Sequence, residues 1–192
     1  MGREFELKYA ANPAVLTALA TQYGPGRQIR METTYFDAPD CALSIRHMTL
    51  RLRRENSDTV CTLKTPLPDG SRGEWECPAD DIEHGIASLL ALGAPAELKA
   101  HTAGGVVPVC GARFTRLACN VPTADGMAEL ALDRGVLLGG GKEIPLCEVE
   151  LELKSGSEKA LLILAETIAA AYGLSPERGS KFRRALALAQ GE

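Results

Sequence analysis

Several features that define common protein classes are missing from this sequence. Its 192 residues include 6 cysteines, but none of them forms a C-x-x-C pair and no histidine clusters near them, so the cysteines are expected to be reduced core residues rather than zinc ligands. No apolar run approaches the roughly 18 residues of a membrane-spanning helix, and the N-terminus has no cationic stretch followed by an apolar one. We therefore expect a soluble, cytoplasmic protein with no membrane partner.

Basic charge and aromatic side chains are also scarce. The formal net charge is −4, whereas binding a nucleic-acid backbone normally requires a basic surface, so we expect no nucleic-acid partner and only local phosphate binding. Aromatic residues make up 5% of the chain, and none cluster in the sequence beside the basic residues. This scarcity disfavours stacking of an aromatic group of a ligand.

The apolar content is sufficient for one core. With 45% hydrophobic residues, residues 1–192 are expected to form a single domain. Capping and stop signals predict helices over 13–23, from Asp80 or Asp81 to about residue 92, from a Ser155–Glu158 capping box to residue 172, and from Ser175 to near the C-terminus. Strand signals predict eight segments, at 3–9, 28–37, 48–55, 59–65, 72–78, 112–120, 126–134 and 144–154.

Charged and apolar residues alternate along several of these strands. "EFELK" at 4–8 alternates acidic, apolar and basic residues, "TLRLRRE" at 49–55 places Arg51 and Arg53 on one face, and "CEVELELK" at 147–154 places three glutamates on one face. Successive side chains of a strand point to opposite faces of a sheet, so each strand has one charged and one apolar face. An ordinary half-exposed sheet explains any one strand, but same-face glutamates repel one another unless positive charge lies among them.

A closed sheet would satisfy these charges together. If the strands form a barrel with the charged faces inside, a metal cation could balance the glutamates and a polyanion could balance Arg51, Arg53 and Lys64. The residues alone therefore indicate a site for a metal ion and a polyphosphate. Glu74 and Glu76 share the inner face and are expected to hold basic residues in place.

The same residues carry a family resemblance. "EFELK" resembles the E-x-E-x-K signature of the CYTH superfamily, the triphosphate tunnel metalloenzymes, and the chain is most similar to their bacterial inorganic triphosphatase branch. The resemblance extends in family order over nearly the whole chain, through "TTYFDAPD" (33–40), "LRLRRE" (50–55), "TLK" (62–64), "RGEWE" (72–76), "FTR" (114–116), "ELALDRG" (129–135), "CEVELELKSG" (147–156) and "SKFRRAL" (180–186).

This resemblance implies an α+β fold, in which an eight-stranded antiparallel β tunnel, a closed barrel with a charged interior, is wrapped by helices. It also implies roles for individual residues. Glu4, Glu6 and Lys8 would be catalytic, and the metal ligands would be Glu4, Glu6, Asp133, Glu148, Glu150 and Glu152. The triphosphate would be bound by Lys8, Arg51, Arg53, Lys64, Arg116 and Lys181. Oxygen ligands of this kind suit Mg²⁺ or Mn²⁺.

The expected reaction is metal-dependent hydrolysis of inorganic triphosphate (tripolyphosphate), which needs charge stabilisation and positioning more than a dedicated nucleophile. The sequence leaves two alternatives open. One is an enzyme for an organic triphosphate, either a thiamine triphosphatase or a class IV-type adenylyl cyclase, and the other is a non-catalytic module that binds polyphosphate or nucleotides. A homodimer and a C-terminal helical phosphate-binding domain beyond this chain also stay open as partners.

Overall fold

The computed structural model describes residues 2–3, 5–67 and 72–191. All of its strands belong to one antiparallel sheet, in the order β1-β6-β5-β4-β3-β7-β8-β9-β2-β10. The strands are β1 (Gly2–Arg3), β2 (Glu6–Ala10), β3 (Arg27–Asp37), β4 (Thr49–Glu55), β5 (Asp58–Pro66), β6 (Arg72–Pro78), β7 (Val107–Pro122), β8 (Met127–Gly139), β9 (Lys142–Ser155) and β10 (Ser175–Pro176).

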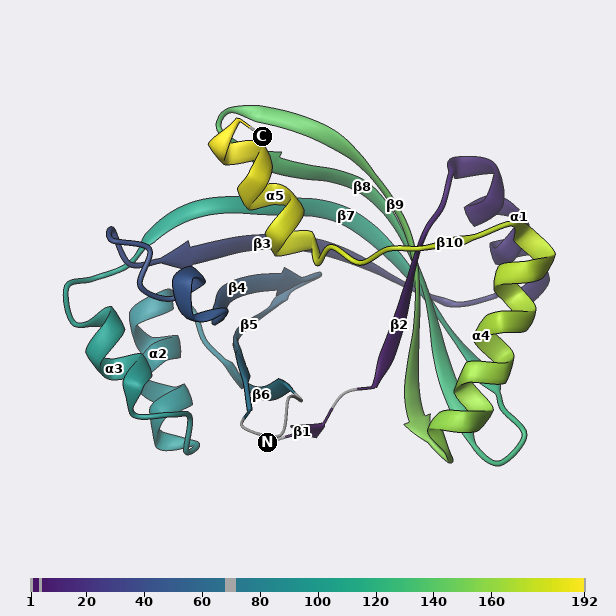
Figure 1. Cartoon of the computed structure of the whole chain (residues 1–192), viewed down its shortest axis with the longest axis horizontal. Coiled ribbons are helices and arrows are strands. Elements are labelled where there is room, and N and C mark those ends of the chain that lie inside the picture. Colours follow the sequence, from purple (N-terminus) through teal and green to yellow (C-terminus); the bar gives the residue numbers. More distant parts are fainter. Residues whose placement is uncertain (1, 4, 68–71, 192) are drawn as a thin grey trace.

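Helices lie at both ends of the sheet. They are α1 (Pro13–Tyr23), α2 (Ile82–Ala91), α3 (Glu97–Thr102), α4 (Glu158–Tyr172), α5 (Lys181–Gln190) and the short 3₁₀ helix η1 (Ser44–Arg46). Figure 1 shows α1 and α4 at one end of the sheet, α2 and α3 at the other, and α5 between them beside β7 and β8. In the described part of the chain, no helix is long and apolar enough to cross a membrane.

The sheet is strongly curled, and the N-terminal segment joins its two sides. β1 pairs with β6, while β2 pairs with β9, and the Phe5 carbonyl extends the second ladder by accepting from the Leu153 amide at 3.0 Å. The predicted antiparallel tunnel fold is confirmed. It has ten strands rather than eight, because the N-terminal strand is divided and β10 is added, and the strand order of the described residues is that of an open sheet rather than a barrel closed by hydrogen bonds.

Local sequence signals explain most of the helix starts. Asn12 caps α1, with Pro13 in its first turn, and Asp81 caps α2 by accepting from the His84 amide at 2.7 Å. Two predicted starts were wrong. Ser157, not Ser155, caps α4, because Ser155 is still paired within the sheet. The last helix begins at Lys181 rather than near Ser175, because Ser175 and Pro176 form β10 and Ser180 is the cap.

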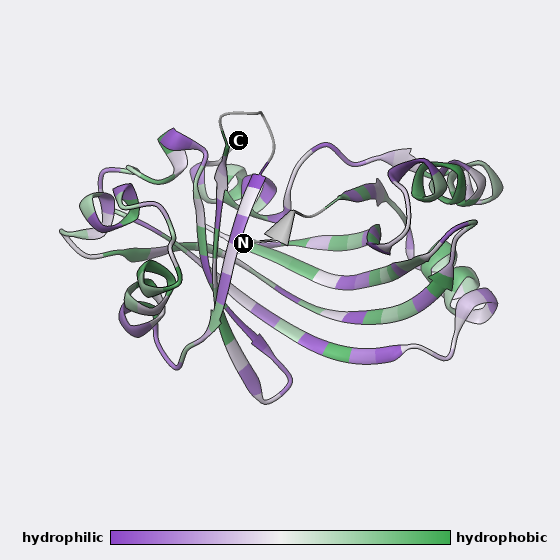
Figure 2. Cartoon of the chain, turned by 90° about the horizontal axis from the view of Figure 1, so that it is seen from below, coloured by the Kyte–Doolittle hydropathy of each residue, from purple (hydrophilic) through white to green (hydrophobic). Residues whose placement is uncertain are grey.

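The two faces of the sheet differ, as the alternation predicted. Figure 2 shows hydrophilic and hydrophobic residues alternating along the strands. On the outer face, one apolar cluster packs α1 and α4 against β7, β8, β9 and β2, and a second packs α2 and α3 against β4, β5 and β6. Because these two clusters bury the apolar side chains of the outer face, the inner face of the sheet can hold the polar and charged side chains.

Candidate functional site

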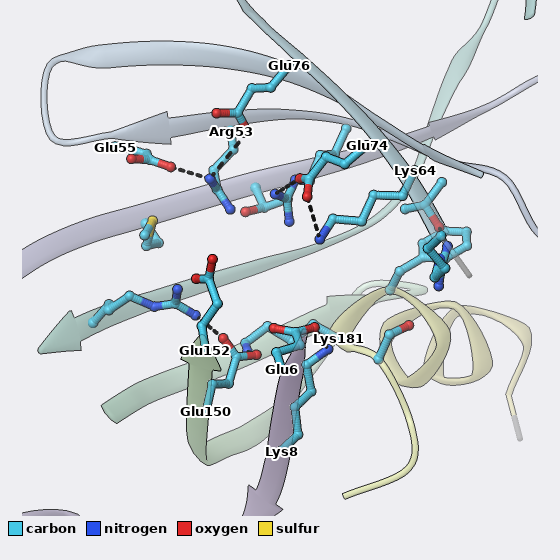
Figure 3. Close-up of a pocket in the computed structure, with 18 of the residues that line it drawn as sticks. Glu6, Lys8, Arg53, Glu55, Lys64, Glu74, Glu76, Glu150, Glu152 and Lys181 are labelled. Atoms are coloured by element: carbon cyan, nitrogen blue, oxygen red, sulfur yellow. Dashed lines mark hydrogen bonds and ion pairs between the residues drawn. The ribbon is translucent and has the colours of Figure 1, made fainter. Parts of the chain in front are cut away.

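The inner face of the sheet lines a cavity of about 1010 Å³. More than half of its lining residues are lysine, arginine or glutamate, which come from most of the strands and from the start of α5. Figure 3 shows two groups of charged side chains facing one another across this space, with Arg53, Lys64, Glu74 and Glu76 on one side and Glu6, Lys8, Glu150, Glu152 and Lys181 on the other. We refer to these as the basic wall and the acidic wall.

The basic wall is formed by β4, β5 and β6. Lys64 Nζ lies 3.3 Å from Glu74 Oε2, and Arg51 Nη2 lies 3.8 Å from Glu74 Oε1. Arg53 contacts Glu55 and lies 3.8 Å from Glu76, so the glutamates hold the basic side chains. The Nε atoms of Arg51 and Arg53 are buried without a hydrogen-bond partner. Buried donors of this kind are normally satisfied, so this wall has hydrogen-bonding capacity for an anion.

The acidic wall contains a buried cluster of Asp133, Glu148 and Glu150, whose ligand atoms all lie within 4.8 Å of one another. Lys181 Nζ lies 2.8 Å from Asp133 Oδ2 and 2.8 Å from Glu150 Oε1, and it also contacts Glu148. Arg116 donates two hydrogen bonds of 2.8 Å to Asp133 and a further one to Glu150. Two cations therefore already occupy the centre of the cluster.

A third cation lies behind this cluster. Arg184, one turn after Lys181 on α5, contacts Glu148 and donates to Glu177 Oε2 at 3.1 Å. The three carboxylates are thus matched by Lys181, Arg116 and Arg184. This pairing keeps the charges tolerable in a buried position and fixes the start of α5 against β8 and β9.

The pKa values in the cluster follow from burial and from these pairs. Burial raises the pKa of Glu148 to about 7, and the neighbouring Glu150 adds to the effect. Burial also opposes charge on Glu150, but Lys181 and Arg116 outweigh it and hold the pKa of that carboxyl well below its usual value. The pKa of Lys181 is raised, because the three carboxylates outweigh its burial. Glu150 is therefore ionised and Lys181 protonated at neutral pH.

A second set of carboxylates lies on adjacent strands facing the cavity. Glu6 on β2 is directly opposite Glu152 on β9, which in turn is opposite Glu129 on β8. Lys8 Nζ lies 2.6 Å from Glu6, and Lys154 Nζ lies 2.7 Å from Glu152. Like charges directly opposite one another in a sheet are destabilising, so this row also favours a bound cation.

The predicted site residues fall into two groups. Nine of them line the cavity: Glu6, Lys8, Arg51, Arg53, Lys64, Arg116, Glu150, Glu152 and Lys181. Asp133 and Glu148 are fully buried behind Arg116 and Lys181 and are not among the lining residues. A metal ion at Asp133 and Glu148 would take the position that the Lys181 ammonium holds, whereas Glu6 and Glu152 present carboxylates to the cavity. Glu150 also lines the cavity, with one oxygen in contact with Lys181 and the other with Arg116. Glu4 lies outside the described residues.

Some charged residues at the cavity or behind it were missed by sequence reasoning. Arg184 and Glu129 complete the charge pattern, and the spacing of three between Lys181 and Arg184 on one helix was a signal for the former. The sequence shows no aromatic cluster, but Phe5, Tyr35, Phe114 and Phe182 all line the folded cavity. The rings of Tyr35 and Phe182 lie 5.1 Å apart, and Lys181 Nζ lies 5.3 Å from the centre of the Phe114 ring.

Comparison with known proteins identifies the family and the fold. The model of the CYTH domain matches residues 2–186. The "Inorganic triphosphatase" of Haemophilus influenzae is 31% identical over 178 residues, which cover 88% of this chain and 50% of that protein. The chain therefore spans about half the length of the curated relative it matches.

Two solved structures show the same fold. The PH1819 protein of Pyrococcus horikoshii is 21% identical, with a TM-score of 0.66 and coverage of 98% of this chain and 99% of that one. A Hippeastrum protein, described as an adenylyl cyclase candidate with a dominant triphosphatase activity, is 19% identical, with a TM-score of 0.65 and coverage of 98% of this chain and 95% of that one. At these identities the likeness concerns the fold alone.

Proposed function

This chain belongs to the CYTH domain family, and from that premise we propose that it hydrolyses inorganic triphosphate in its charged cavity with the help of a divalent metal ion. The observation that carries the proposal is the pairing of a basic and an acidic wall across one cavity. A triphosphate needs cationic donors along its chain, and a metal ion needs carboxylate oxygens. An anionic triphosphate bound together with a metal cation would therefore contact both walls.

The basic wall binds the phosphate chain in this proposal. Arg51 and Arg53 have donors without a protein partner, and their planar guanidinium groups suit bidentate contacts to phosphate oxygens. Lys64 adds a compact charge beside them. Across the cavity, Lys8, Arg116 and Lys181 supply further protonated donors. Burial lowers the pKa of the Lys8 and Lys181 ammonium groups, but the carboxylates around them outweigh it and raise the pKa of each.

In this proposal, the acidic wall binds the metal ion and orients the water molecule that attacks the terminal phosphate. Glu6, Glu150 and Glu152 would hold Mg²⁺ or Mn²⁺, whose chemistry is to neutralise charge on the phosphate oxygens during transfer. The ionised Glu150 and its neighbours accept hydrogen bonds from a water molecule and orient it toward the terminal phosphate. Asp133 and Glu148 act one layer further out, where they fix Arg116 and Lys181.

A second candidate substrate is an organic triphosphate, such as thiamine triphosphate or ATP. The aromatic side chains favour it, because Phe5 and Phe182 are only partly buried and line the cavity beside the charged residues. Aromatic rings stack on planar heterocycles. Phe114 is less suited to this role, because Lys181 lies over its ring.

The test is phosphate release from tripolyphosphate, thiamine triphosphate and ATP, each with Mg²⁺, Mn²⁺ or EDTA. We expect metal-dependent release chiefly from tripolyphosphate, reduced roughly 100-fold by Arg53→Gln, as when one charge-stabilising donor is removed from an active site. Glu6→Gln is expected to reduce release and to raise the metal concentration required. Glu166→Gln, on the exposed face of α4, is the matched control for charge.

Each other outcome has a defined meaning. Preferential release from an organic triphosphate, with cyclic AMP checked as a product from ATP, would replace the substrate but keep the site. Tight binding of tripolyphosphate without turnover under any metal condition would replace hydrolysis by a binding function. Equal activity of Arg53→Gln and wild type would contradict the assignment of the basic wall.

A further inference from the structure

A second cavity lies on the opposite, outer face of the sheet. This outer groove has a volume of about 610 Å³ and is lined by residues of β3, β4, β7 and β8 and by Asn56. All of its basic residues are arginines, namely Arg30, Arg54, Arg113 and Arg134, and each is exposed. They alternate along their strands with residues that face the catalytic cavity, such as Arg53 and Phe114. The two cavities therefore lie on opposite faces of the sheet, with Met31 and Phe114 lining both.

The strand register places the four arginines in a compact array. Across β4, β3 and β7, Arg54, Glu32 and Arg113 are neighbours in one row. Two residues along, Arg30, Thr115 and Arg134 form the next row across β3, β7 and β8. Adjacent strands are about 4.8 Å apart and alternate residues of a strand about 6.7 Å apart, so the arginines are within reach of one short anionic chain.

The charge of this array is incompletely balanced by the protein. Arg54 lies 2.5 Å from Glu32 and Arg113 lies 3.0 Å from Glu143, but these pairs are between side chains that are more than half exposed. Exposed pairs of this type contribute little stability and exchange partners readily. Within the described ranges, Arg30 and Arg134 have no acidic side chain within ion-pair distance. The chain as a whole has a net charge of −4, so the positive charge of this groove is a local concentration of arginines.

We propose that the outer groove binds a linear inorganic polyphosphate chain, as a second site separate from the catalytic cavity. The use of arginine alone fits this ligand, because its guanidinium group forms bidentate contacts with phosphate oxygens. A phosphate chain also carries charge at every unit, which matches four cations gathered on one small surface. The Thr115 hydroxyl and the Asn56 side chain amide add polar contacts at the floor and rim.

Nucleic acid fits this groove less well. Single-stranded nucleic acids are bound through aromatic side chains on which bases stack, together with basic residues. Phe114, the aromatic residue at this groove, is buried, and its ring lies beneath Lys181 on the other face of the sheet. The described residues of the groove therefore provide contacts for phosphate groups but no stacking surface.

The test compares wild type with Arg30→Gln/Arg134→Gln, which removes the two arginines without an ion pair. Long-chain inorganic polyphosphate is titrated by calorimetry in EDTA, and the Nε–Hε signals of the arginines are followed by NMR. We expect two classes of sites in the wild type, with the Arg30 and Arg134 signals shifting on titration. In the variant, one class is weakened by roughly tenfold, since each lost contact to a charged group costs modestly at an exposed position.

The control is Lys99→Gln/Lys159→Gln, which removes the same charge from the exposed surfaces of α3 and α4 and should bind like the wild type. Circular dichroism and thermal melting verify that each variant is folded. Unchanged affinity and stoichiometry in Arg30→Gln/Arg134→Gln, or Arg30 and Arg134 signals that do not shift, would overturn the proposal. It would also fail if poly-glutamate or a single-stranded oligonucleotide bound this groove as tightly as the phosphate chain.

Discussion

Lys181 is the residue on which the charge balance of the site depends. Its ammonium contacts Asp133, Glu148 and Glu150 at once, and it lies at the first position of α5, directly after the Ser180 cap. Because only a tenth of its side chain is exposed, these contacts are shielded from water. Lys181 therefore holds α5 on the sheet while it also presents positive charge to the cavity.

Removing the charge of Lys181 tests how much it contributes to holding α5 on the sheet. Lys181→Met should lower the free energy of unfolding by about 3 kcal/mol at neutral pH, as for a broken buried ion pair. The loss should be smaller at pH 5, where the raised pKa of Glu148 leaves that carboxyl protonated, and smaller with added Mg²⁺. Urea unfolding measures the effect, with Lys181→Arg as the control that keeps the charge. Equal losses under all three conditions would show that lost packing, not charge, is responsible.

Glu148 provides a separate pH prediction. Its pKa is about 7 in the folded protein because of burial, against a usual value of 4.5. A carboxyl with a raised folded pKa binds its proton more tightly in the native state, so its contribution to stability is complete below pH 4.5 and is lost as the pH rises through 7. In EDTA, we expect this loss to be on the order of 2 kcal/mol.

The comparison is with Glu148→Gln, which cannot titrate at this position. The free energy of unfolding should change less between pH 4.5 and 7 in this variant than in the wild type, because that interval is where Glu148 loses its proton. Chemical unfolding at a series of pH values gives both curves. Parallel curves for the two proteins over this interval would contradict the assignment of the titration to Glu148.

At the scale of elements, α5 shows where sequence reasoning succeeded and where it failed. The motif "SKFRRAL" marked Lys181 as a candidate for the site, and Lys181 lines the cavity. The helix was predicted to begin near Ser175, because Pro176 is typical of a first turn, but Ser175 and Pro176 instead pair with Ala10 and Tyr9 of β2. The pairing of a distant strand is tertiary information, which local capping signals do not contain.

For the strands, too, the sequence predicts some features and not others. The period of two fixed which side chains share a face, so the inward positions of Arg51, Arg53, Lys64 and Glu150 were predictable. The strand register was not, and it decides which charges become neighbours. The register places Asp133 between Arg116 and Glu148, and the docking of α5 adds Lys181, so the predicted metal ligands Asp133 and Glu148 lie in contact with cationic side chains.

The docking of α5 can be tested through one glycine. A Cβ added at Gly139, at the end of β8, would lie 2.4 Å from the Ala185 carbonyl oxygen and 2.7 Å from the Ala189 amide nitrogen, so the helix must shift if this residue becomes larger. Gly139→Ala should cost roughly 1–3 kcal/mol of unfolding free energy by overpacking. Because α5 carries Lys181, the same variant should bind tripolyphosphate more weakly.

Gly104→Ala is the matched control, because a Cβ there meets no atom within 4 Å. Chemical unfolding and calorimetric titration with tripolyphosphate measure the two effects. If Gly139→Ala loses stability while its affinity for tripolyphosphate stays that of the wild type, α5 does not transmit its position to the site.

At the scale of the whole molecule, the curled sheet brings two walls of opposite function together without a continuous ladder of hydrogen bonds between its edges. β1 pairs with the basic side at β6, and β2 pairs with the acidic side at β9, so the N-terminal strands contact both walls in addition to the sheet that joins them through β3 and β7. Both walls concentrate charge in a partly buried space. A ligand that contacts both should therefore stabilise the entire fold.

This argument predicts a large thermal shift on ligand binding. At a concentration about 100 times its dissociation constant, a ligand adds about 2.7 kcal/mol to the stability of the native state. For a chain of this length, tripolyphosphate with Mg²⁺ should raise the Tm by roughly 5–10 °C in the Glu6→Gln variant, in which hydrolysis is slowed. Differential scanning fluorimetry measures the shift. Adding Arg51→Gln and Arg53→Gln to the Glu6→Gln chain should remove most of it, since the basic wall then lacks its guanidinium donors, and an undiminished shift would mean that the ligand does not bridge the two walls.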